Sequence, residues 1–161
     1  MSRFLKYWLP VLLWMLGIFY LSTNAGSSAN TSRIIEPVLR WLMPHLSTHM
    51  IHQVHSVIRK VGHLAEYAVL GWLLWRALRQ TQTGGTGGSA WKAALGVLML
   101  SAAYAATDEF HQSFIPTRTP SVRDVMIDTG GSLFSVAIAC TCTACRRKPS
   151  VEPRPSQTTV A

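Results

Sequence analysis

Ionisable side chains are concentrated in the segment Thr107–Asp128, which lies between two long apolar runs of a hydrophobic chain. Four of the seven acidic residues of the whole sequence lie there: Asp108, Glu109, Asp124 and Asp128. An ionisable group at membrane depth is costly, so it is retained where it pairs with other polar groups or performs a function. The segment therefore predicts a functional site or an essential polar network.

Three segments carry polar side chains at spacings that place them on one side of a helix, because residues three, four or seven apart share a helical face. The stripes are Lys60, His63 and Tyr67, with Glu66 beside them; Tyr104, Asp108 and His111, with Glu109 and Gln112 adjacent; and Asp124 and Asp128, followed by Gly131. The short connection Ser113–Ser121 contains two prolines, so the helices that it joins are expected to be antiparallel neighbours. One polar pocket formed by three helices would satisfy all of these groups.

The residue types in these stripes suit phosphate binding and proton transfer. Guanidinium and ammonium groups bind phosphate, and histidines and carboxylates can move protons. The candidate acid–base residues are His63, Glu66, Asp108, Glu109 and His111; the candidate binding residues are Lys60, Tyr67, Gln112, Arg118, Arg123, Asp124 and Asp128. The sequence contains no serine-elbow motif and no His-Glu-x-x-His motif, so we predict no metal or other cofactor, and whether the site catalyses a reaction stays open.

Most of these residues also have a structural explanation. The cations could extend to lipid headgroups, and the histidines could be satisfied interface groups. Asp124 falls in the first turn of its helix, where negative charge is favoured. Glu66 and Asp128 resist such explanations, because each lies about one turn inside an apolar run.

Four apolar runs must position these stripes. They span residues 4–21, 61–78, 91–107 and 122–144, and each approaches the roughly 17–25 residues that a helix needs to cross a bilayer. Buried strands would be much shorter. The sequence therefore predicts an all-α membrane protein: a bundle of four transmembrane helices in one domain, residues 1–145. A basic, disordered tail is expected over residues 146–161, and a flexible linker over Thr81–Ser89.

The segment between the first two runs predicts an amphipathic helix on the membrane surface. Apolar residues recur with helical period over Leu46–Val61. Four histidines fall on the opposite face, and their spacing could serve metal binding or pH sensing. No carboxylate within that helix would orient the imidazoles, so we favour a solvated polar face. These histidines are His45, His49, His52 and His55.

The flanking charges indicate the orientation of the chain. Arg3 and Lys6 precede the first run, which places the N-terminus in the cytoplasm; four crossings then return the C-terminus to the same side. The polar stripes would lie at the outer face. An alternative is that the first run is a cleaved signal peptide with a small-residue site near Ser27-Ser28-Ala29, although the run is long for one and contains Pro10.

Two other compositional features receive structural explanations. The formal net charge of +8 could suggest nucleic-acid binding, but the cations flank apolar runs, so no nucleic-acid partner is predicted. Cys140, Cys142 and Cys145 do not share one helical face, which argues against a zinc or redox site. They are interpreted as small apolar side chains.

The combined spacings resemble the VanZ-like family of small bacterial integral membrane proteins. The similarity covers residues 5–145 and is carried by four motifs: Lys60-x2-His63-x3-Tyr67-x2-Leu70, Asp108-Glu109-x-His111-Gln112, Phe114-Ile-Pro116-x-Arg118 and Asp124-x3-Asp128-x2-Gly131. The founding member is associated with resistance to the glycopeptide teicoplanin. Asp128 departs from the pattern, since family members often carry asparagine there. The resemblance implies a bacterial plasma-membrane protein, without an agreed reaction.

Two functions follow as hypotheses. In the first, the stripes bind or process an anionic lipid or a lipid-linked wall precursor at the outer leaflet, with a phosphorylated headgroup among the cations. In the second, the charged cluster is an internal network that holds a non-enzymatic scaffold or partner-binding bundle. A transporter is less consistent with a cluster at one end of four spans. The sequence leaves the oligomeric state open.

Overall fold

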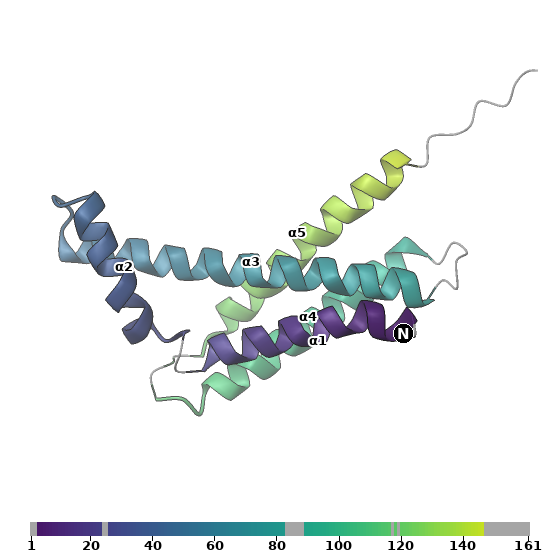
Figure 1. Ribbon diagram of the computed structural model, residues 1–161, viewed down its shortest axis with the longest axis horizontal. Helices are drawn as coiled ribbons and strands as arrows, with labels where there is room; N and C mark the ends of the chain where they lie inside the picture. Colours follow the sequence, from purple (N-terminus) through teal and green to yellow (C-terminus); the bar gives the residue numbers. More distant parts are fainter. Residues whose placement is uncertain (1–2, 24–25, 83–88, 117, 119, 147–161) are drawn as a thin grey trace, which may run out of the picture.

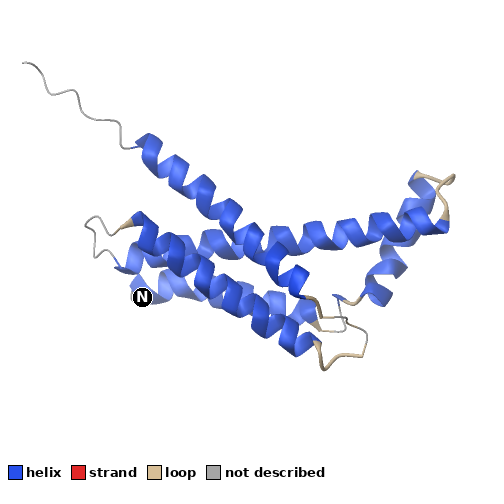
Figure 2. Cartoon of the chain, turned by 180° about the vertical axis from the view of Figure 1, so that it is seen from behind, coloured by secondary structure: helices blue, strands red, loops and turns tan. Residues whose placement is uncertain are grey.

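Five helices make up the described part of the chain, which comprises residues 3–23, 26–82, 89–116, 118 and 120–146 of a computed structural model. They are α1 (Arg3–Ser22), α2 (Ser28–Leu42), α3 (Thr48–Gln82), α4 (Ala90–Gln112) and α5 (Val122–Arg146). The described residues contain no strand (Figure 2). The all-α prediction is therefore confirmed. The predicted linker and tail lie largely outside the described residues.

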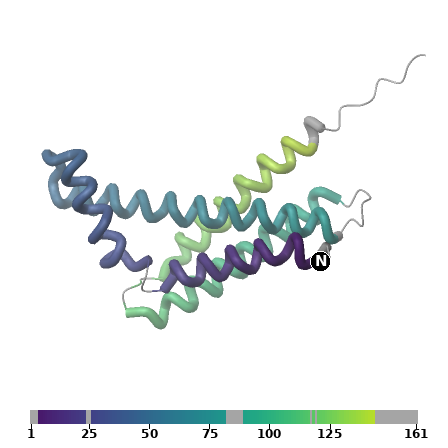
Figure 3. The backbone as a smooth tube through the Cα atoms, in the orientation of Figure 1, coloured from purple at the N-terminus to yellow at the C-terminus, as the bar shows by residue number. Residues whose placement is uncertain are grey.

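The long helix α3 is the centre of the fold. It packs against every other helix, and α1 and α4 accompany its C-terminal half (Figure 1). α5 crosses α3 obliquely, and α2 folds back from the N-terminal end of α3. The N-terminal part of α3 and the C-terminal part of α5 extend beyond the bundle in different directions (Figure 3).

Three helices are long and apolar enough to cross a membrane: α1 over Phe4–Ser22, α4 over Ala90–Gln112 and α5 over Val122–Thr143. Length and composition therefore support a multi-pass membrane protein. α3 is not among these segments, because His63, Glu66 and Arg76 interrupt its apolar part. The fourth predicted span, 61–78, stays a prediction.

The segment between the first two apolar runs contains one helix more than predicted. Residues 48–82 form one continuous helix, with no break between the expected surface helix and the expected span. A separate helix, α2, was not predicted. Ser27 caps it by accepting a hydrogen bond from the backbone amide of Asn30 at 3.3 Å. Leu39 is buried, whereas Trp41 is 81% exposed.

The predicted histidine face is also wrong in part. His45 precedes α3, whereas His49 and His52 are exposed on it. His55 is buried, one turn after the buried Ile51, with its Nε2 3.0 Å from the Thr31 hydroxyl of α2. The physical reason is that α2 packs on this side of α3, which the periodicity of one helix cannot reveal.

Small residues bring α3 and α5 into close contact. A Cβ atom at Gly131 would collide with the backbone carbonyl of Leu64, and one at Gly71 would lie 2.8 Å from the Cα of Ser132. The Ser132 hydroxyl donates a hydrogen bond of 2.9 Å to the carbonyl of Tyr67. Such stripes of small residues let helix backbones approach closely in membranes. This contact sets the distance between His63 of α3 and Asp128 of α5, which lie beside it.

Candidate functional site

A polar pocket of about 180 Å³ lies where the N-terminal end of α2, the middle of α3, the C-terminal end of α4 and the start of α5 meet. Its lining unites residues of all four predicted motifs with Ser28 of α2. The lining residues are Ser28, Ser56, Arg59, Lys60, His63, Gln112, Arg118, Asp124 and Ile127. Three cations and one histidine thus surround a single carboxylate. We call this cavity the polar pocket.

A second cavity of about 200 Å³ adjoins it between the C-terminal end of α1, α2 and α3. Arg59, His63 and Arg118 line both cavities. The remaining wall of the second cavity is largely apolar, with Ser22, Thr31 and Glu66 as further polar side chains. The apolar side chains are Leu21, Ile35 and Ile58. We call this cavity the apolar pocket.

His63 and Asp128 meet behind the polar pocket. The Nδ1 atom of His63 lies 3.5 Å from Oδ1 of Asp128, and the Asp128 side chain is 0% exposed. Neither atom makes a hydrogen bond of normal geometry, and Oδ2 of Asp128 also has no partner among the described residues. The close α3–α5 contact at Gly131 positions this pair, because Asp128 lies one turn before Gly131 and His63 directly precedes Leu64.

Asp108 joins α4 to α1 in the buried interior. Its Oδ2 accepts a 2.7 Å hydrogen bond from the Ser22 hydroxyl and a 3.0 Å bond from Nε2 of Gln112. Its Oδ1 has no partner among the described residues. The fully buried Tyr67 lies nearby, with its ring centroid 6.3 Å from that of Tyr104, and the Tyr67 hydroxyl is also unpartnered.

Glu109 and Arg118 hold the connection between α4 and α5 in place. Glu109 Oε2 accepts a 2.7 Å hydrogen bond from the amide of Ser121, which directly precedes α5. Arg118 donates hydrogen bonds to the carbonyls of Leu21 and Thr23 at the end of α1. Both side chains therefore fasten helix ends as well as lying near the candidate site.

Not every predicted residue reaches the pockets. The His111 ring packs against the Phe19 ring in a tilted arrangement, with the centroids 4.6 Å apart, and His111 lines neither pocket. Arg123 is exposed and is also absent from both linings. The structure adds Arg59 to the site, and this residue is not among those predicted from the sequence. Its position beside Lys60 was the signal that could have found it.

The family comparison agrees with the motif spacing. The VanZ/LLP1 family model matches residues 7–143 of the chain. The chain belongs to the VanZ/LLP1 family. No curated protein and no solved structure matches it.

In this VanZ/LLP1 chain, Arg118 lines both cavities. Burial lowers the pKa of Arg118, and the neighbouring Arg59 lowers it further, whereas Asp108, Glu109 and Glu66 oppose the shift. An arginine keeps its charge at neutral pH even so, because its ordinary pKa is very high. Arg118 is therefore a permanent cation of the polar pocket.

Unpartnered buried polar atoms cluster beside the polar pocket of this VanZ/LLP1 chain. Among the described residues they include the Tyr67 hydroxyl, Oδ1 of Asp108, both oxygens of Asp128 and Nδ1 of His63. Buried polar atoms normally have a partner, and those that do not call for a specific explanation. Their shared location indicates that protons, water or a ligand complete the network there.

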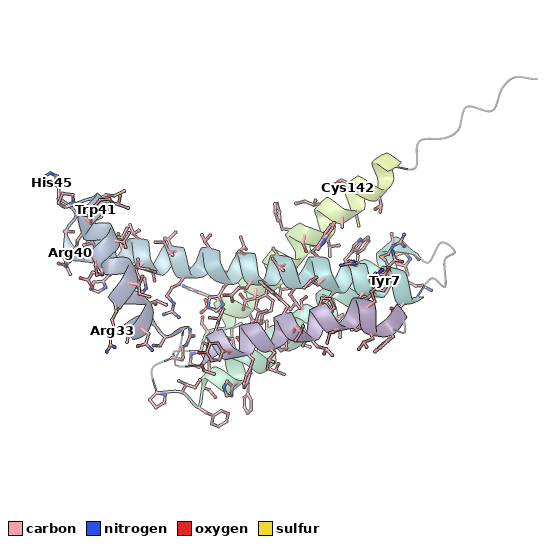
Figure 4. The ribbon with its side chains drawn as sticks, viewed as in Figure 1. Tyr7, Arg33, Arg40, Trp41, His45 and Cys142 are labelled. Atoms are coloured by element: carbon pink, nitrogen blue, oxygen red, sulfur yellow. The ribbon has the colours of Figure 1, made fainter. Side chains whose placement is uncertain are left out.

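The other basic side chains of the same end lie outside the pockets. Arg33, Arg40 and His45 project from α2 and the loop after it, far from Tyr7 at the opposite end (Figure 4). Arg40 pairs with Glu36 at 2.8 Å, one helical turn away. An exposed pair of this kind contributes little to stability. Because Arg33, Arg40 and His45 line neither the polar pocket nor the apolar pocket, they are not part of the candidate site.

Proposed function

We propose that this VanZ/LLP1 protein binds the phosphate group of an anionic membrane lipid in its polar pocket. The observation that carries the proposal is the set of three cations, Arg59, Lys60 and Arg118, around one concave surface with a single carboxylate, Asp124. Guanidinium groups bind phosphate oxygens in pairs, and a lysine ammonium adds a compact charge. The exposed position of Lys60 suits a headgroup that enters from the membrane surface.

The adjoining apolar pocket supports a lipid over a soluble anion. Leu21, Ile35 and Ile58 line it, and it shares Arg59, His63 and Arg118 with the polar pocket. A lipid could place its phosphate among the cations and the first carbons of its chain in the apolar pocket. A soluble anion would leave that second surface uncovered.

The proposal includes a fourth membrane span, the C-terminal part of α3. The 35 residues of α3 correspond to about 52 Å, well beyond the roughly 30 Å of a bilayer core. His63, Glu66 and Tyr67 need not face lipid, because Tyr67 is 0% exposed and the other two line the pockets. α3 then crosses the bacterial plasma membrane and projects past its outer surface, with both chain termini in the cytoplasm. Cysteine labelling at Ser113 and Ser89 tests this: an outside-only reagent should modify the Ser113→Cys variant alone, and the reverse pattern inverts the orientation.

Co-purification of lipids tests the central proposal. The wild-type protein should retain a phosphorylated lipid through detergent extraction, and the Arg59→Ala and Lys60→Ala variants should lose most of it. Lys92→Ala is a matched control, because Lys92 is an exposed lysine of α4 outside both pockets. If all four proteins carry the same lipids, the proposed binding site is wrong. A link to glycopeptide resistance would follow if the retained lipid were a cell-wall precursor.

A second function, a non-enzymatic scaffold, is favoured by the bonds of Asp108, Glu109 and Arg118. Each of them joins helix ends to another segment of the chain. If the charged cluster is only a scaffold, the Arg59→Ala and Lys60→Ala variants should keep the lipid profile of the wild type. The Asp108→Asn variant should then lose thermal stability without any change in bound lipid.

A further inference from the structure

The charges around the polar pocket fit a dianion better than a monoanion. Arg59, Lys60 and Arg118 face one carboxylate, Asp124, so the described lining carries an excess of positive charge before His63 is considered. A phosphate monoester carries about −1.5 to −2 charges at pH 7, because its second ionisation lies near pH 6. A phosphodiester lacks that second ionisation and carries a single charge.

His63 adds a group that can exchange a proton with the ligand. Its Nδ1 edge is closed off against Asp128, while the side chain as a whole keeps 19% exposure and borders both pockets. The exposed part of the ring therefore lies away from the Nδ1 edge, on the side that borders the pockets. In histidines, the partner of one ring nitrogen determines which protonation state the other nitrogen presents.

The fully buried Asp128 gives His63 such a partner. A buried, ionised carboxylate without hydrogen bonds is strongly unfavourable, so it must hold a proton or pair with a cationic neighbour. Nδ1 of His63, 3.5 Å away, is the basic nitrogen that pairs with it. A small approach of the two side chains would complete a hydrogen bond and direct Nε2 towards the pocket. Asp128 is thus a positioning residue for His63.

We propose that the polar pocket selects a lipid with a terminal phosphate monoester, and that His63, positioned by Asp128, shares a proton with that phosphate. The inference rests on the proposed function and names its ligand class. A monoester has both the second negative charge that the cations require and an oxygen that can be protonated near neutral pH. A diester has neither. No bond other than those to the shared proton forms or breaks.

Other titratable groups also face His63. Glu66 on α3 and Asp124 on α5 interact with it electrostatically, and the permanent cations Arg59 and Arg118 line the same cavities. The permanent cations raise the local affinity for any anion. The pH dependence that is specific to a monoester must therefore be separated from this background by comparison with a diester.

Binding to lipid nanodiscs provides this comparison. The protein is titrated in discs of phosphatidylcholine that contain either phosphatidic acid, a monoester, or phosphatidylglycerol, a diester, with matched acyl chains. We expect about tenfold tighter binding of phosphatidic acid, the equivalent of one additional charge-assisted contact. Equal or tighter binding of phosphatidylglycerol would overturn the monoester inference and leave lipid binding intact. No preference for either lipid over phosphatidylcholine would overturn the proposed function as well.

The role of the His63–Asp128 pair has its own readout, the pH profile. Above about pH 7 a free histidine is mostly neutral, so the complex must take up a proton from solution when His63 and the phosphate come to share one. The affinity for phosphatidic acid should therefore fall with rising pH. The Asp128→Asn and His63→Gln variants should show a shallower profile and a phosphatidic acid preference close to one. Lys92→Ala should behave as the wild type. A wild-type pH profile in Asp128→Asn would refute the positioning role of Asp128. The lipid preference of the wild-type protein is measured without any variant, so it does not depend on how well the variants fold.

Inorganic phosphate distinguishes a lipid ligand from a soluble one. If the ligand is a lipid, inorganic phosphate should displace phosphatidic acid only at far higher concentration, because it cannot occupy the apolar pocket. Displacement at an equal concentration would overturn the lipid part of the inference.

Discussion

Replacement of Gly131 by alanine should separate α3 from α5. The added Cβ atom would collide with the carbonyl oxygen of Leu64 and would lie 3.1 Å from the amide nitrogen of Ala68. These atoms belong to one turn of the α3 backbone, which cannot move away as the end of a side chain could. Overpacking of this kind typically costs about 1–3 kcal/mol, even after the higher helix propensity of alanine is considered.

Gly130 is the matched control for Gly131. An added Cβ atom at Gly130 has no neighbour within 4 Å, so alanine there should be neutral or should raise the stability by up to about 1 kcal/mol through helix propensity. In thermal unfolding in the same detergent, Gly131→Ala should therefore melt below the wild type, and several degrees below Gly130→Ala. Because the same contact positions Asp128 beside His63, Gly131→Ala should also weaken lipid binding. Equal melting temperatures for the two variants would refute the account of the α3–α5 contact.

Two further predictions concern the start of α5 and the contact between α2 and α3. Glu109→Ala removes the 2.7 Å bond to the amide of Ser121 and should destabilise the protein by about 1–2 kcal/mol, which a lowered melting temperature would show and an unchanged one would contradict. Burial lowers the pKa of His55, and the nearby Arg59 and His52 lower it further. The unfolded chain therefore binds this proton more readily than the folded one, so the stabilisation by His55 is present above about pH 6.5 and is lost as the pH falls through its lowered pKa. The hydrogen-exchange protection factors of α2, which are corrected for the slower intrinsic exchange at low pH, should fall on acidification in the wild type and change less in His55→Gln; identical responses would contradict this assignment.

The helices that sequence patterns predicted best are those with uniform composition. α1, α4 and α5 follow apolar runs whose length alone indicates a membrane span. α2 was missed because its sequence is amphipathic and contains Pro37. Among its described residues, only Leu39 is buried. Its presence reversed the environment of His55. Local periodicity defines the faces of one helix, but it does not say what packs against them.

Part of the candidate site could be predicted in the same way, from the faces of single helices. The helical stripes grouped polar residues of three helices into one pocket, and the structure brings Lys60, His63 and Asp124 together there, with Asp128 beside His63. They could not predict that Ser22 of α1 would bind Asp108 across 86 positions of the sequence, because the rotation of α1 about its axis depends on the whole bundle.

Site-resolved NMR of the histidine rings shows whether the lipid phosphate reaches His63 in the polar pocket. The protein with nitrogen-15-labelled histidine is titrated with phosphatidic acid in nanodiscs, and the signal of His63 is assigned by its loss in His63→Gln. The resonances of the His63 ring nitrogens should shift in proportion to binding. Those of His111, which packs against Phe19 outside both pockets, should not shift. Saturating binding that leaves the His63 signals unchanged would contradict the claim that the phosphate occupies the polar pocket.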